Sequence, residues 1–410
     1  MSAPLTSYQK KLFLFLGVAT FFEGYDFMAL SQLLPKLRVA FDLEPSAAGY
    51  LIGTVNIGAV LAFFLVRMAD RVGRRRMLTV TIAGYTAFTL LSGLAPNIYA
   101  FALLQLLARV FLLAEWALSM VIAAEEFPAD RRGLVIGFLQ GINGVGSVAC
   151  ALLVPLLVDD QHPEHWRRIY FVAVLPLLLL AYARRGLKET SRFEAQVVPR
   201  EARPLMHIWS TPYRGRMLEL GAIWFVSYIA AQNAVSLWNE HASNELGFST
   251  QQVGLAIAIA AGVSMPLVFA VGKLIDRVGR KPGAAIVYAV AAAGTYLCFT
   301  LEAFWPVTAA LVLGIFGAQA YLPVLNAYTT ELFPTELRGD AFAWCNGILG
   351  RIAYVGSPFV VGGIVGATGL DYGPIVAATA VFPIVAVALI YALLPETSNR
   401  ELEETAALPS

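Results

Sequence analysis

Apolar residues occur in long runs along most of the chain, and short polar segments separate the runs. A helix needs about 20 apolar residues to cross the hydrocarbon core of a bilayer. The runs predict membrane-spanning helices in the first half at residues 11–34, 47–69, 77–96, 99–124, 134–157 and 167–183. In the second half they predict helices at residues 217–239, 250–274, 284–302, 304–329, 341–367 and 371–394. We therefore expect an all-α membrane protein with twelve transmembrane helices.

Two polar motifs between these runs occur twice, at the same displacement of 206 residues. The sequence Asp-Arg-Val-Gly-Arg begins at Asp70 and again at Asp276, and an acidic segment with Phe-Pro and Arg-Gly begins at Glu125 and again at Glu331. A displacement of half the chain indicates two pseudo-symmetric six-helix bundles, an architecture typical of proteins that move a solute across a membrane. The predicted parts are an N-terminal bundle at 1–184, a cytoplasmic linker at 185–216, a C-terminal bundle at 217–396 and a cytoplasmic tail at 397–410.

Composition and charge support a membrane location. Hydrophobic residues make up 58% of the chain and charged residues 14%, whereas a soluble domain carries about 25% charged residues. Lys and Arg gather on alternate connections, which predicts that both termini face the cytoplasm and that the chain lies in the plasma or inner membrane. The net charge of +1 gives no support to a nucleic-acid partner. No phosphate-binding loop, metal-ligand spacing or nucleophile with its base is recognisable, so we expect no cofactor, no metal and no enzymatic activity.

The repeated motifs, at these positions between the predicted helices, resemble those of the major facilitator superfamily over essentially the whole chain. The tail Pro395-Glu396-Thr397-Ser398 is similar to that of the sugar-porter and organic-ion branches. The resemblance implies alternating access between two bundles. Charged side chains in the repeated loops can bridge neighbouring helix ends and would then close the cytoplasmic side in one state; the alternative is that their arginines only fix the topology. The predicted gating residues are Asp70, Arg71, Arg74, Asp276, Arg277, Arg280, Glu126, Arg132, Glu331 and Arg338.

Ionisable residues inside predicted membrane helices are costly and usually functional. The first helix carries Glu23 and Asp26, and the fourth carries Arg109 and Glu115. Burial favours the neutral form of a carboxyl group, and a nearby guanidinium favours the charged form, so making and breaking such a contact would load and release a proton. We predict Asp26 as the proton-binding group, with Arg109 as its partner and Glu23 as a second acid. The alternative is a structural ion pair between Asp26 and Arg109.

A guanidinium in the eleventh predicted helix, Arg351, is the candidate anchor for a substrate carboxylate, because it binds carboxylates through two parallel hydrogen bonds and keeps its charge. Its surroundings in the sequence resemble those of organic-anion and aromatic-acid members of the superfamily. The alternative is an arginine paired with a neighbouring acid. Polar and aromatic residues at membrane depth complete the predicted substrate site, although interhelical hydrogen bonds would explain the amides equally well. They are Tyr25, Gln140, Asn143, Gln232, Asn233, Gln319 and Tyr354, with Tyr321 and Asn326 as further polar candidates and Phe22, Trp224, Tyr228 and Trp238 as candidates for apolar walls.

These observations predict a proton-coupled symporter for a small organic anion, a monocarboxylate or an aromatic acid, that works as a monomer. Two alternatives keep the fold: a proton-coupled sugar or polyol symporter, and a drug efflux antiporter. A ligand-binding sensor without net transport is a third alternative. The short tail after the last predicted helix argues against it.

Overall fold

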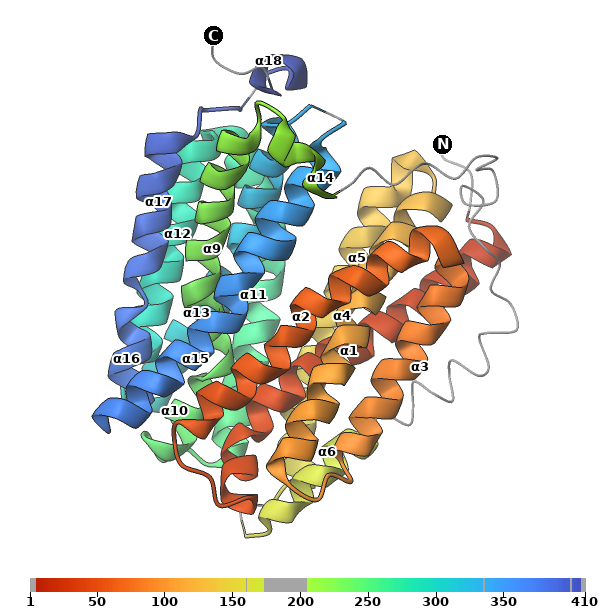
Figure 1. The fold of residues 1–410 in the computed structure, drawn as a ribbon. Helices are drawn as coiled ribbons and strands as arrows, with labels where there is room; N and C mark the ends of the chain where they lie inside the picture. Colours follow the sequence, from red (N-terminus) through yellow and green to blue (C-terminus); the bar gives the residue numbers. More distant parts are fainter. Residues whose placement is uncertain (1–4, 160, 173–204, 335, 399, 407–410) are drawn as a thin grey trace. The chain divides into compact units, whose positions relative to one another are not determined.

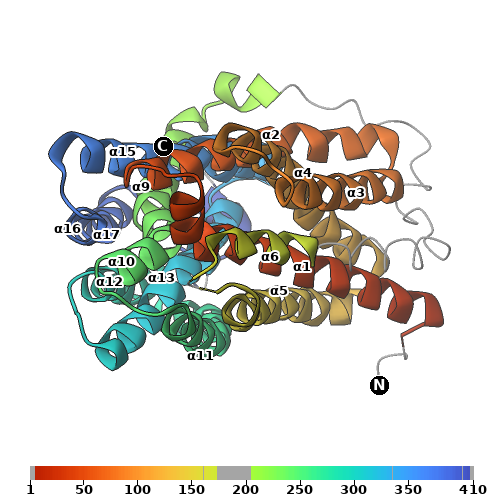
Figure 2. The same cartoon turned by 90° about the horizontal axis from the view of Figure 1, so that it is seen from below.

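The computed structural model describes residues 5–159, 161–172, 205–334, 336–398 and 400–406. Helices form nearly all of this part of the chain, and it contains no strand (Figures 1 and 2). The chain divides into two compact units. Unit 1 comprises Met1–Leu43, Thr54–Glu201 and Ser249–Ala258, and unit 2 comprises Glu44–Gly53, Ala202–Phe248 and Ile259–Ser410. The predicted all-α class is confirmed.

Nine helical segments in the described part are long and apolar enough to cross a membrane. They are Ser7–Ala40, Ala47–Ala69, Ile98–Glu126, Leu134–Leu157, Arg214–Asn244, Thr250–Val278, Phe304–Glu331, Arg338–Thr368 and Tyr372–Leu393. The predicted third and ninth helices form, as Arg74–Ser92 and Arg280–Cys298, but they are not among these nine. The predicted sixth helix, 167–183, is described only up to residue 172. The number twelve therefore stays a prediction, as do the bundle boundaries and the linker at 185–216, most of which lies outside the described residues.

Unit 1 is built from long helices in two tightly packed pairs. α1 packs along α5, and α3 packs along α4. The elements are α1 (Ser7–Ala40), most of α2 (Ala47–Val72), α3 (Arg74–Ser92), α4 (Ile98–Glu126), α5 (Ala129–Leu157), η1 (Pro163–Trp166) and α6 (Arg167–Phe171). The first helix begins with a capping box, in which Thr6 and Gln9 exchange side-chain to backbone hydrogen bonds, and this arrangement satisfies two backbone N–H groups that a helix start leaves free.

Glycines bring the backbones of α1 and α5 into contact. A Cβ atom on Gly146 would lie 1.9 Å from the carbonyl oxygen of Phe21, and one on Gly24 would lie 2.0 Å from that of Asn143. No side chain fits in either place. This close approach sets the polar residues of α1 directly against α5, which is how Glu23 meets Asn143.

Replacing Gly146 with leucine is expected to destabilise the protein by about 3 kcal/mol or more, because the new side chain must push two packed helices apart. Thermal unfolding of the purified protein measures the effect. The matched control is Gly262→Ala on α11, where an added Cβ meets nothing within 4 Å and the change from glycine to alanine favours the helix by up to about 1 kcal/mol. Equal melting temperatures for both variants would contradict the contact.

Unit 2 contains the remaining helices, several of which are interrupted. Its elements are η3 (Leu205–Ser210), α9 (Arg214–Ser236), α10 (Trp238–Asn244), most of α11 (Thr250–Val278), α12 (Arg280–Cys298), α13 (Phe304–Glu331), α14 (Arg338–Phe342), η4 (Ala343–Gly350), α15 (Arg351–Thr368), α16 (Tyr372–Ala378), α17 (Val381–Leu393) and α18 (Leu402–Ala406). α12 packs along α13, and α9 packs against η4, α13, α15 and α17.

Two predicted continuous helices of unit 2 are irregular. The predicted helix 341–367 is a π-helix over Ala343–Gly350 and becomes an α-helix from Arg351. Such wide turns often occur at functional sites. The predicted helix 371–394 is broken after Ala378, and α17 starts two residues before Pro383, which has no N–H to donate to the preceding turn.

The repeated loop motif has the same backbone geometry in both units. Gly73 and Gly279 precede α3 and α12 with φ angles of 103° and 101°, a conformation that side chains with a Cβ rarely adopt. The duplicated sequence therefore encodes a duplicated turn. In unit 2 the carboxylate of Glu396 closes this turn, since it accepts hydrogen bonds from the backbone N–H groups of Arg280 (2.8 Å) and Lys281 (2.9 Å).

The Glu396 cap predicts a pH-dependent stability. Burial alone would raise the pKa of Glu396, but the backbone donors of Lys281 and Arg280 outweigh it, so the pKa of this carboxyl lies below its ordinary value. A lowered pKa means that the contribution is present above the ordinary value of about 4.3 and is lost as the pH falls through the lowered one. We expect Glu396→Gln to cost about 0.5–1 kcal/mol at neutral pH and nothing in strong acid. Thermal unfolding across this pH range checks it.

Candidate functional site

Unit 1 buries three carboxylic acids and one arginine at membrane depth. Glu23 (6% exposed) and Asp26 (5%) come from α1, and Arg109 (4%) and Glu115 (0%) come from α4. All four lie within the helices that are long and apolar enough to span a membrane. A charge in such surroundings is energetically unfavourable unless an oppositely charged partner or a proton neutralises it. The net excess of acids over arginine therefore favours a site that binds protons.

The acids have different neighbours. Glu23 accepts a hydrogen bond of 2.6 Å from the side-chain amide of Asn143 on α5. Asp26 lies within the electrostatic influence of the Arg109 guanidinium, but no ion pair within 4.0 Å joins them in the described chain. Arg109 instead lies with its guanidinium carbon 4.8 Å from the centre of the Phe27 ring, and its Nη1 atom has no hydrogen-bond partner. The structure therefore gives no support to a closed ion pair between Asp26 and Arg109.

Glu115 is an acid to which the sequence assigned no role. Its Oε1 atom accepts a hydrogen bond of 2.7 Å from Ser119, one turn further along α4. Its Oε2 atom is buried and has no partner. A buried oxygen without a hydrogen bond costs less free energy in a neutral, protonated carboxyl group than in a charged carboxylate. The protonated group needs only one acceptor for its O–H. Glu115, which also acts electrostatically on Glu23, thus belongs to the same polar group.

Unit 2 places Arg351 among tyrosine rings. Its guanidinium carbon lies 4.8 Å from the ring centre of Tyr354 and 5.3 Å from that of Tyr228. Within the described chain no carboxylate lies within 4.0 Å of it. Aromatic faces attract a cation but do not neutralise it. The predicted alternative, in which Arg351 pairs with a neighbouring acid, is therefore absent from the described residues.

The aromatic cluster around Arg351 is continuous and fixed by hydrogen bonds. Tyr228 stacks on Trp224 at 5.7 Å and meets Tyr321 edge-on at 5.7 Å. Its hydroxyl donates to the Oδ1 atom of Asn346 in the π-helix, at 2.7 Å. The indole N–H of Trp224 reaches Thr329 at 3.3 Å. The π-helix before Arg351 thus supplies, through Asn346, the hydrogen-bond partner of Tyr228, whose ring lies against the Arg351 guanidinium.

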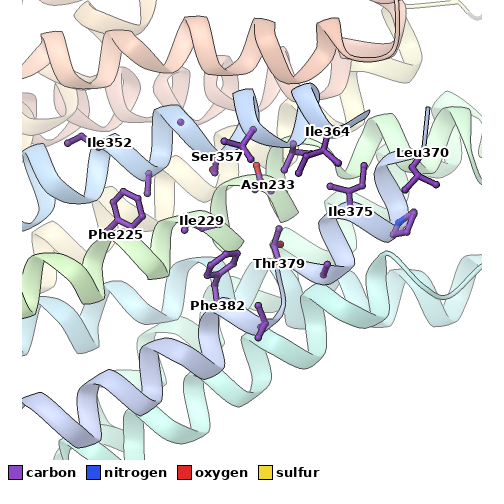
Figure 3. Close-up of a pocket in the computed structure, with 17 residues that line it drawn as sticks. Phe225, Ile229, Asn233, Ile352, Ser357, Ile364, Leu370, Ile375, Thr379 and Phe382 are labelled. Carbon is purple, nitrogen blue, oxygen red and sulfur yellow. The ribbon is translucent and has the colours of Figure 1, made fainter. Parts of the chain in front are cut away.

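Other predicted substrate residues lie apart from these two groups. Tyr25 donates its hydroxyl to the carbonyl of Ile169 at 3.2 Å. Gln232 is bonded to Ser236 one turn away, at 2.7 Å. Gln140 and Gln319 are exposed. Asn233 lines a pocket between α9, α15, α16 and α17 (Figure 3). Their contact with a substrate stays a prediction.

The repeated loops form equivalent ion pairs in the two units. Arg74 bonds Glu125 through its Nε atom at 3.1 Å, and Arg280 bonds Glu331 through its Nη2 atom at 2.7 Å. Arg280 also bonds Asp276. In the first unit the predicted gating acid was Glu126, whereas the acid that pairs with Arg74 is Glu125. The constant displacement of 206 residues from Glu331 would have identified it.

The remaining predicted gating residues are of three kinds. Arg277 is exposed, and Arg338 donates to the carbonyl of Phe333 at 3.0 Å. Glu126 accepts a hydrogen bond from the side chain of Gln9 through its backbone carbonyl, at 2.9 Å. The side chains of Asp70, Arg71 and Arg132 lie outside the described part of the structure.

Known proteins match this chain over nearly its whole length. A family model of the Major Facilitator Superfamily matches residues 16–238 and 220–409. The chain is 26% identical to the putative niacin/nicotinamide transporter NiaP of Bacillus subtilis, with 96% of this chain and 98% of the relative covered. It is 27% identical to the cis,cis-muconate transport protein of Acinetobacter baylyi, with coverages of 91% and 92%. The crystal structure of a D-xylose-proton symporter is similar in fold, with a TM-score of 0.78 at 18% identity over 95% of this chain and 99% of that one.

Proposed function

Because the chain belongs to the major facilitator superfamily, and is therefore a transporter and not an enzyme, we propose that it is a proton-coupled symporter for a small organic anion. The substrate is a monocarboxylate or an aromatic acid. Two six-helix bundles expose its site alternately to the two sides of the membrane. Both termini face the cytoplasm, and a single chain is sufficient because it supplies both bundles.

The observation that carries the substrate class is the position of Arg351. A half-buried guanidinium without a carboxylate partner is unfavourable, because its charge has lost part of its water and gained only the side chains of Tyr228 and Tyr354 in return. A substrate carboxylate would neutralise it through two parallel hydrogen bonds, and Tyr228 and Tyr354 would offer their rings to an aromatic body. A sugar has no charge to offer and would leave Arg351 uncompensated. The relatives whose names include niacin and muconate, both organic acids, agree with this choice.

The proton site in this proposal is the acidic group of unit 1. Asp26 carries the coupling proton, with Arg109 as the cation that favours its release and Glu23 as a second acid. Arg109 has an unused Nη1 atom, so it can approach Asp26 when the helices move. The ion pairs of Arg74 and Arg280 belong to the cytoplasmic gate, which opens and closes with the bundles.

The test is proton movement in liposomes that contain the purified protein. A pH-sensitive dye inside reports acidification when carboxylates, sugars or amines are added outside. Acidification with a carboxylate and none with sugars is expected. A response to sugars alone would contradict the proposal and favour a sugar or polyol symporter. A single charge that crosses a membrane potential of 100 mV gains or loses about 2.3 kcal/mol. One proton and one monoanion together carry no net charge, so their symport is electroneutral and unaffected by the membrane potential.

A further inference from the structure

Unit 2 contains a pocket that is separate from the aromatic cluster around Arg351. Its volume is about 690 Å³, within the range of about 300–1,000 Å³ that is usual for small-molecule sites. Figure 3 shows it between α9, α15 and the broken helix formed by α16 and α17. From α15 it is lined by Ile352, Gly356 and Ser357, whereas the Arg351 guanidinium lies against Tyr228 and Tyr354.

The walls of the pocket are apolar, and its rim is open. Phe225 (38% exposed), Ile352 (53%), Ile364 (40%) and Val381 (50%) contribute to it. All four lie on helices that are long and apolar enough to cross a membrane. Exposed apolar side chains on such helices are solvated by lipid chains. A ligand that enters here therefore comes from the hydrocarbon phase and has an apolar body.

Two buried polar groups face this apolar space without partners. Asn233 is 0% exposed, and neither its Oδ1 nor its Nδ2 atom has a hydrogen-bond partner. Ser357 is 7% exposed, and its hydroxyl is also without a partner. A buried amide or hydroxyl without a hydrogen bond costs about 1–3 kcal/mol. The third polar residue of the pocket, Thr379, is satisfied by the carbonyl of Val376.

The arrangement of these groups defines the ligand chemistry. A carboxamide presents one donor and one acceptor side by side. Its complement is a head that also presents one acceptor and one donor, which a protonated carboxyl group or a primary amide does. An ionised carboxylate does not fit, because the described lining contains no cation. The Ser357 hydroxyl can add a third hydrogen bond.

We propose that this pocket binds an amphiphile from the membrane, an acyl chain with a neutral carboxyl or carboxamide head, and that Asn233 and Ser357 hold the head. In this proposal Asn233, one of the predicted substrate residues, holds the amphiphile and not the transported substrate, and binding does not depend on the identity of that substrate. The acyl chain lies along the apolar side chains of α9, α15 and α17.

Photolabelling tests this proposal. The full chain in lipid nanodiscs is irradiated with a palmitic acid that carries a diazirine on its chain, and labelled peptides are identified by mass spectrometry. We expect labels on α9, α15 and α16–α17. Unlabelled palmitic acid and palmitamide compete, whereas methyl palmitate, which lacks the donor, competes about tenfold less well, a difference of about 1.4 kcal/mol. Absence of labels from these helices, or equal competition by the ester, would overturn the proposal.

Two variants separate a built site from general contact with lipid. Asn233→Leu removes both unpaired amide atoms and is expected to reduce labelling about tenfold while the melting temperature stays equal or rises. Gly356→Leu fills the pocket, where an added Cβ meets nothing within 4 Å. Asn326→Leu, an exposed amide on α13, is the matched control and keeps full labelling. Unchanged labelling in both pocket variants would refute the site. Displacement of the probe by carboxylates that the protein transports would assign the pocket to the transport site instead.

Discussion

Replacing Asp26 with asparagine is expected to abolish substrate accumulation driven by a pH gradient while it leaves exchange of substrate for substrate intact. Asparagine has nearly the same size but cannot take up or release a proton. The loaded transporter can still change sides, because the amide is neutral like the protonated acid. Uptake and counterflow of a radiolabelled substrate in proteoliposomes measure both activities. In the variant, we expect the substrate to equilibrate and not to concentrate.

The comparison with other acids makes this prediction specific. Glu302→Gln changes an exposed acid between α12 and α13 and is the control that keeps full accumulation. Glu23→Gln and Glu115→Gln test the two other buried acids of unit 1 in the same assay. If Asp26→Asn still concentrates the substrate and Glu115→Gln does not, the coupling proton belongs to the acid that bonds Ser119. That result would contradict the assignment of Asp26.

The gross fold was predictable because membrane helices and repeats leave strong signals. Apolar runs of about 20 residues identify spans, and the motif that begins at Asp70 and Asp276 located two equivalent turns, which Gly73 and Gly279 make with matching positive φ angles. The irregular elements were less accessible. The π-helix that ends at Gly350 has the same apolar composition as an α-helix, so periodicity does not distinguish them. The break before α17 depends on Pro383, a signal that the sequence does contain.

Side-chain partners were predictable only in part. The sequence singled out Asp26, Arg109 and Arg351, since charge at membrane depth is rare. It could not tell that Arg109 faces Phe27 rather than a carboxylate, because rotamers and small helix rotations decide such contacts. The amide of Asn233 illustrates the same limit. A polar residue in an apolar run indicates a polar contact, but the sequence does not say on which face of the helix it lies.

Replacing Arg351 with glutamine is expected to weaken binding of the anionic substrate by about 100-fold, or about 2.7 kcal/mol. The loss combines two charge-assisted hydrogen bonds with the charge itself. Arg351→Lys is expected to recover only part of the affinity, because an ammonium group keeps the charge but cannot form two parallel bonds or spread over the faces of Tyr228 and Tyr354. Titration of the purified protein by isothermal calorimetry gives the dissociation constants.

Because the guanidinium has no carboxylate partner in the described chain, its removal leaves no orphaned acid behind. Folding should therefore survive the substitution, and the melting temperature without substrate is expected to stay equal or rise, since a half-buried cation in aromatic surroundings is itself unfavourable. Arg400→Gln, which removes an exposed charge from the tail, is the control for net charge and keeps wild-type affinity. Unchanged affinity in Arg351→Gln, with the protein folded, would show that the carboxylate anchor lies elsewhere. A neutral substrate would then become the better explanation of the aromatic cluster.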